Sequence, residues 1–151
     1  MKTFKQVVEF FESAANDSLV VNTFKFGTID KLDASDQNVY YPYVFLRPVT
    51  SPGLVLNPNG VSGTRTLTFE LYSLDVPKLT ESDYLGVMSD TEQTLYDIIG
   101  YVNRGVEQQN AFITLTNIAP VNEAFQDRLY GFVATLNYSE AGIIDYCNFP
   151  S

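Results

Sequence analysis

Residues 83 to 103 place apolar side chains at intervals of three and four, the spacing of an amphipathic helix. The apolar positions are Leu85, Met88, Leu95, Ile98, Ile99 and Val102, and Gly105 follows as a helix stop. Alternatively, the helix is broken at Ser89 and Asp90, and its true start is an N-cap at that point. A helix of this length must bury its apolar face against another layer, so the chain needs a partner layer for it.

The segments on both sides of this helix have the composition of β-strands. They are 19–26, 39–49 and 64–76 before the helix, and 111–118 and 128–138 after it. In the segment 64–76, Arg65, Leu67, Phe69 and Leu71 alternate with Thr66, Thr68, Glu70 and Tyr72, which indicates a sheet with one face against a core. Pro42 and Pro48 predict an edge position, a bend or a bulge in the segment 39–49.

A second helix is predicted at the start of the chain. Thr3 and Gln6 have the spacing of a capping box, and Asn16, Asp17 and Ser18 end the helix. Its apolar face carries Phe4, Val7, Val8, Phe11 and Ala15. We therefore predict an α+β fold, with a mainly antiparallel sheet of about five strands and with the N-terminal helix and the long helix packed on one side. Residues 1–151 are expected to form a single domain.

Two segments carry more apolar residues than an exposed connection or chain end needs. The predicted loop 50–63 holds Leu54, Val55 and Leu56 between turn-forming residues. The triplet either contacts another subunit or folds back over the domain's own core. The C-terminal tail 139–151 either packs on its own domain or augments a neighbour's sheet. The candidate subunit-interface residues are Leu54, Val55, Leu56, Ile143, Ile144, Tyr146 and Phe149.

The charge of the chain limits its partners. Eighteen acidic and nine basic residues give a net charge of -9, and the basic residues are scattered. A surface that binds nucleic acid tightly through its phosphates is therefore not expected. The apolar stretches are much shorter than the roughly 20 residues of a membrane helix, so we expect no membrane span. The single cysteine allows no internal disulfide, and we expect a cytosolic rather than a secreted protein.

The residues that most often carry chemistry are scarce. The chain has no histidine, and its only cysteine, Cys147, is expected to be a buried apolar side chain. Asp30, Asp33 and Asp36 could surround a hard cation, but they lack the ligand alternation, central glycine and closing glutamate of a calcium loop. The carboxylate pairs at 81 and 83 and at 90 and 92 are better explained as surface charge. We expect no catalytic residue, no metal and no cofactor.

Five segments resemble one known family. They are the N-terminal helix, YYPYVFLRPV at 40–49, TLTFELYSLDVPK at 66–78, TLYDIIGYVN at 94–103 and DRLYGFVATLNY at 127–138. Their order, with Asp127, Gly131 and Phe132 in the last one, resembles the tail terminator and neck ring proteins of tailed bacteriophages. The resemblance covers most of the chain and includes no catalytic motif, and the apolar tail 139–151 departs from the family pattern.

The resemblance implies a structural subunit of the virion neck or tail, made in the host cytoplasm. Such subunits form a closed homo-oligomeric ring that joins the portal or head to the tail, contacts neighbouring neck or tail proteins and lets DNA pass. A negative lumen would repel phosphates during passage. Two alternatives stay open. The first is a monomeric adaptor that binds a protein partner through residues 50–63, and the second is a hydrolase that uses carboxylates alone.

Overall fold

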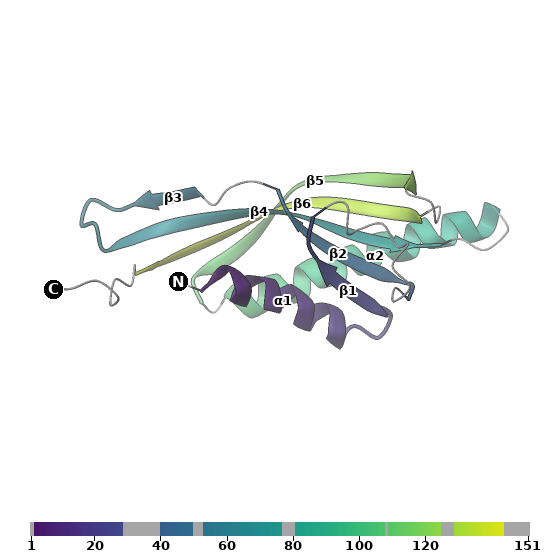
Figure 1. Ribbon diagram of the computed structural model, residues 1–151, viewed down its shortest axis with the longest axis horizontal. Helices are drawn as coiled ribbons and strands as arrows, with labels where there is room; N and C mark the ends of the chain where they lie inside the picture. Colours follow the sequence, from purple (N-terminus) through teal and green to yellow (C-terminus); the bar gives the residue numbers. More distant parts are fainter. Residues whose placement is uncertain are drawn as a thin grey trace.

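The computed structural model describes residues 2–28, 40–49, 53–76, 81–107, 109–124 and 129–143 (Figure 1). The elements follow the chain as α1 (Phe4–Asp17), β1 (Thr23–Phe26), β2 (Tyr43–Pro48), β3 (Gly53–Leu56), β4 (Ser62–Asp75), α2 (Glu81–Glu107), β5 (Ala111–Ala124) and β6 (Leu129–Ile143). The predicted α+β class is confirmed. In this part of the chain, neither helix has an apolar stretch long enough to span a membrane.

The strands form one sheet in the order β1, β2, β4, β6 and β5, and β3 pairs with β4 beyond the end of β2. Only the pairing of β1 with β2 is parallel; the other described pairings are antiparallel. The sheet thus has six strands rather than about five. The additional strand is β3, which lies inside the segment that we predicted as a loop, because residues 53–56 align with 63–66 of β4 across a short turn.

Both helices cover the same face of the sheet (Figure 1). The alternation in β4 sets this face, because Leu67, Phe69 and Leu71 point toward the helices and are at most 2% exposed. Val7 and Phe11 of α1 join the same core. The core also contains Leu95, Ile98, Val102 and Val106 of α2 and Ala134, Leu136 and Tyr138 of β6. The periodicities of the two helices and of β4 therefore predicted most of the buried side, but the prediction was wrong for Leu85 and Phe4, which are 71% and 38% exposed near the starts of the two helices.

A second apolar cluster lies on the face of the sheet that the helices do not cover. It contains Tyr43, Phe45, Tyr72, Leu74 and Leu129, all of which are buried. Tyr72 lies on the face opposite Leu71, as the alternation predicted, but at this end of β4 both faces of the sheet are buried rather than one. Tyr72 pairs across the sheet with Phe45, and their rings meet edge to face at 6.3 Å, which gives the tyrosine an apolar neighbour.

The ends of several elements differ from the predicted ends. The capping box is present at the start of α1, where Gln6 donates its backbone N–H to Thr3 and Thr3 donates to the Gln6 side chain. Helix α2 runs without a break through Ser89 and Asp90 and continues past Gly105. Strand β1 begins at Thr23 rather than at 19, and β6 continues to Ile143. Helix propensity and tertiary packing thus outweigh the single glycine and the Ser-Asp pair.

Candidate functional site

The candidate functional site is a three-stranded arm, which we define as β3 together with residues 62–66 of β4 and residues 139–143 of β6. These segments are hydrogen-bonded in the order β3, β4, β6. The arm extends past the helix layer at one end of the molecule (Figure 1). Because no helix covers its outer part, apolar side chains there are left exposed.

The predicted interface residues have different positions on this arm. Leu54, Val55 and Leu56 are 52%, 71% and 53% exposed, and Ile143 at the end of β6 is 73% exposed. The alternative that the triplet folds back over the domain's own core is therefore wrong for this structure. Ile144, Tyr146 and Phe149 lie outside the described residues. Whether the exposed side chains contact another subunit stays a prediction.

The four exposed side chains lie on both faces of the arm. Leu54 is paired with Arg65 and Leu56 with Gly63, so both leucines lie on the helix-side face of the sheet. Val55 is paired with Thr64, and Ile143 with Ser62, which places these two side chains on the opposite face. The arm can therefore contact a partner with either face, and it also has an outer edge.

The base of the arm is fixed to the N-terminus by a buried charge cluster. The Arg65 guanidinium lies 3.4 Å from the Glu140 carboxylate, and the two side chains are only 17% and 5% exposed. Glu140 also accepts from the Lys2 backbone N–H at 2.9 Å and from the Tyr138 hydroxyl at 3.0 Å. Arg65 donates in turn to the Lys2 carbonyl. Burial, and then the bond to Glu140, raise the pKa of Tyr138 above its usual range.

The tip of the arm is the turn at residues 57–62, and hydrogen bonds from its own polar side chains stabilise it. The Asn59 side-chain oxygen accepts from the backbone N–H groups of Val61 and Ser62. Asn57 donates its side-chain amide to the Ser62 hydroxyl at 2.7 Å. Gly60 has a φ of 70°, a left-handed conformation that glycine adopts without strain. The tip is therefore ordered by local bonds, although no helix supports it.

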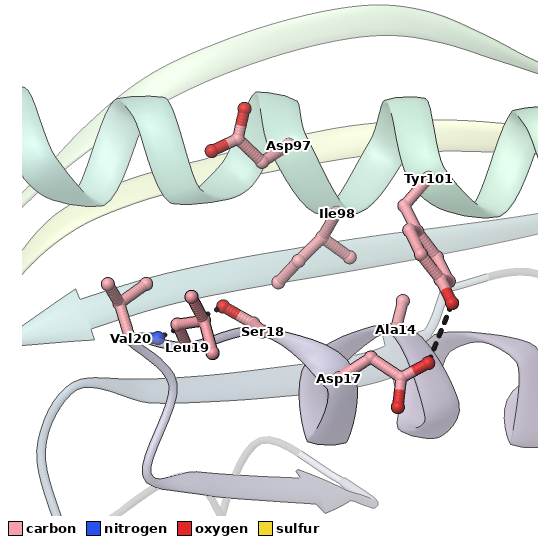
Figure 2. Close-up of a pocket in the computed structure, with 8 residues that line it drawn as sticks. All are labelled: Ala14, Asp17, Ser18, Leu19, Val20, Asp97, Ile98 and Tyr101. Carbon is pink, nitrogen blue, oxygen red and sulfur yellow. Dashed lines mark hydrogen bonds between the residues drawn. The ribbon is translucent and has the colours of Figure 1, made fainter.

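A cavity of about 290 Å³ lies between the end of α1 and the middle of α2 (Figure 2). Its lining residues are Ala14, Asp17, Ser18, Leu19, Val20, Asp97, Ile98 and Tyr101. Ile98 points from α2 toward the end of α1, and the Tyr101 hydroxyl donates to Asp17 at 2.6 Å. Leu19 is fully exposed at the rim. This cavity was not predicted; the signal for it in the sequence was the apolar pair Leu19 and Val20, which directly follows the predicted end of the N-terminal helix.

A further polar cluster, formed by Arg47, Glu70 and Tyr72, lies on the helix-free face. The Tyr72 hydroxyl donates to Glu70 at 2.6 Å, and Arg47 lies 3.3 Å from the same carboxylate oxygen. Burial, followed by the bond to Glu70, raises the pKa of Tyr72 to about 12. These contacts hold Tyr72 neutral and fix its ring against the second apolar cluster.

Metal-binding geometry is not seen in the described ranges. No group of three or more aspartate, glutamate, histidine or cysteine side chains lies together there. Asp30, Asp33, Asp36 and Cys147 lie outside these ranges, so the hard-cation alternative stays untested.

No protein-family model matches the chain, and no curated protein matches it either.

Proposed function

We propose that this chain is a structural subunit of a ring in the neck or tail of a tailed bacteriophage. The single observation that carries the proposal from the structure is the arm with its exposed Leu54, Val55, Leu56 and Ile143. A subunit of a closed ring must offer neighbouring copies a surface that its own fold leaves uncovered. Exposed apolar groups held on a fixed support meet that requirement. The order of elements supports the family through the resemblance described above.

The proposed ring joins the head or portal to the tail, contacts neighbouring neck or tail proteins and lets DNA pass without binding it. The acidic character of the chain suits a DNA conduit, because a negative wall repels phosphates. The described carboxylates are concentrated on the helix layer, where Glu9, Glu12, Asp17, Asp90 and Asp97 are exposed. If these described carboxylates line the lumen, the helix layer faces the channel.

A monomeric adaptor is the second candidate, and the cavity between α1 and α2 favours it. A concave site with an exposed leucine at its rim could accept an apolar side chain of a partner protein. Leu19 and Val20 would then be the contact residues, rather than the arm. An adaptor that binds through this cavity uses a different surface from the ring, so substitutions separate the two. An adaptor that binds through residues 50–63 would share the arm and would differ from the ring by staying monomeric.

The test is the pair Leu56→Asp and Leu19→Asp. Each variant places a charge at an exposed leucine, so each should change the unfolding free energy by less than about 1 kcal/mol. Ring assembly, measured by light scattering and electron microscopy with the neighbouring ring proteins present, should be lost in Leu56→Asp, because the charge must be desolvated in the interface. Leu19→Asp should assemble normally.

The opposite result would support the adaptor. If Leu19→Asp lost partner binding while Leu56→Asp assembled normally, the arm would not be the contact surface. A large fall in the melting temperature of Leu56→Asp would show that the leucine belongs to the subunit's own core.

A further inference from the structure

The outer edge of β3 presents backbone hydrogen-bonding groups away from the arm. The Asn57 N–H donates to the Ser62 carbonyl at 2.9 Å, so residues 57 and 62 form a hydrogen-bonded pair of the antiparallel ladder. Such pairs alternate along the two strands, and the next one is Val55 with Thr64. The N–H and C=O groups of Leu54 and Leu56 therefore point outward. No strand pairs with this edge among the residues that the structure describes.

The opposite edge of the sheet is protected in three ways. Strand β5 has irregular pairing between Leu115 and Asn117, and again between Val121 and Ala124. Pro120 removes one outward N–H from this edge, and the outward N–H of Ile113 donates to the Asn103 side chain at 2.9 Å. Bulges, proline and local caps are the devices that prevent strand pairing between molecules. The edge strand β1 carries a further such device, the charged Lys25.

Strand β3 has none of these devices. Its sequence Gly-Leu-Val-Leu contains no charge and no proline, and its register with β4 is regular. No charged residue occurs from 53 to 64, in a chain whose net charge is -9. Two copies can therefore bring these segments together without placing like charges opposite one another.

The edge is also self-complementary. If two β3 strands run antiparallel about a two-fold axis at Val55, Leu54 lies opposite Leu56 of the second copy, and each such pair exchanges two backbone hydrogen bonds. The four leucines then share one face, and the two Val55 side chains meet on the other. This single register therefore both pairs the outward N–H and C=O groups of Leu54 and Leu56 and brings the apolar side chains of the two copies together.

We propose that the β3 edge is a docking site for the β3 edge of a second copy of this chain, in this antiparallel register. The pairing goes beyond the proposed ring, since it holds whether or not the chain also assembles head to tail. A four-residue contact covers much less than the roughly 1,200 Å² of a standard stable interface. The pairing is therefore reversible, and it covers the exposed edge while no other partner is bound.

The test is disulfide trapping in a Cys147→Ser background. The two copies of Val55 form a pair without hydrogen bonds, with Cα atoms about 4.5 Å apart, which suits a disulfide. Val55→Cys should therefore give a disulfide-linked dimer under mild oxidation. Leu54→Cys is the matched control, because the two copies of residue 54 are offset by two positions and lie more than about 7 Å apart. When the Leu54→Cys and Leu56→Cys variants are mixed, a disulfide should form between residue 54 of one copy and residue 56 of the other.

Equal cross-linking of Val55→Cys and Leu54→Cys would indicate random collision and would overturn the proposal, as would no cross-linking of either variant. Sedimentation velocity of the unmodified chain should show a dimer whose fraction rises with concentration and which Val55→Asp abolishes. A purely monomeric chain at millimolar concentration would also overturn it. Failure of this dimer would not count against the proposed ring, because a ring that forms with neighbouring proteins needs no two-fold dimer.

Discussion

Gly131 is the position where a single added atom has the clearest consequence. A Cβ at this residue of β6 would lie 1.9 Å from the Ser73 carbonyl oxygen of β4, and its φ of +156° disfavours other residues. Backbone cannot move aside as a flexible side chain can. Gly131→Ala should therefore lower the unfolding free energy by about 2–4 kcal/mol in urea denaturation.

Gly100 provides the matched control for that prediction. It lies inside α2, and an added Cβ would meet no atom within 4 Å beyond its chain neighbours and the local helix backbone. Gly100→Ala should raise the unfolding free energy by about 0.5–1 kcal/mol, because alanine has less backbone freedom to lose. Equal destabilisation by both substitutions would show that the close approach at Gly131 is not the cause.

The buried hydroxyl of Tyr72 should make the unfolding free energy fall at alkaline pH. Its pKa is raised to about 12 from an ordinary value of 10.0, mainly by burial and then by the bond to Glu70. The neutral phenol is therefore favoured in the folded state. This contribution to stability is complete below pH 10 and is lost as the pH rises through 12. In Tyr72→Phe, the unfolding free energy should fall less steeply in this window, by at most about 1.4 kcal/mol per pH unit.

The measurement is urea denaturation at several pH values, in wild type and variant. Below pH 9 the two curves should be parallel, since Tyr72 does not ionise there in either state. Identical slopes above pH 10 would contradict the environment described for Tyr72.

At the scale of elements, the arm depends on its buried anchor. Glu140→Gln removes the charge that compensates Arg65 where both side chains are largely buried, so the unfolding free energy should fall by about 2–4 kcal/mol. In this variant, amide hydrogen exchange should also become faster than in the unmodified chain, and the increase should be larger in residues 62–66 than in the centre of β4. Glu70→Gln is the control, because its ion pair with Arg47 is more exposed, at 22% and 32%, and should contribute less. An unchanged exchange rate in the arm would show that the anchor does not fix it.

At the scale of the whole molecule, charge predicts the orientation of the proposed ring. Among the described side chains, the exposed carboxylates gather on the helix layer, so a lumen lined by these groups has α1 and α2 facing the channel. Electron microscopy of the assembled ring should show this orientation, and the isolated subunit should show no measurable duplex binding. A channel lined by lysine and arginine would refute the conduit argument and leave the assembly role unaffected.

The order of the two helices and of five of the six strands, and most of the buried faces of α1, α2 and β4, follow from local patterns in the sequence. Periods of two and of 3.6 residues are local signals, so the faces of α1, α2 and β4 could be predicted from them. The capping box at Thr3 is equally local. Element ends were less well predicted, since α2 passes Gly105 and β6 reaches Ile143 only because neighbouring elements supply packing and strand partners.

Tertiary structure decided the rest, because the contacts join residues that are distant in sequence. Arg65 and Glu140 are 75 positions apart, and Tyr101 and Asp17 are 84 apart. The segment 53–56 is a strand rather than a loop because β4 offers it a partner on the side that β2 leaves open. Its apolar side chains stay exposed because the helix layer ends before the arm does (Figure 1). The sequence marked Leu54, Val55 and Leu56 as unusual, and only the sheet showed which of their backbone groups face outward.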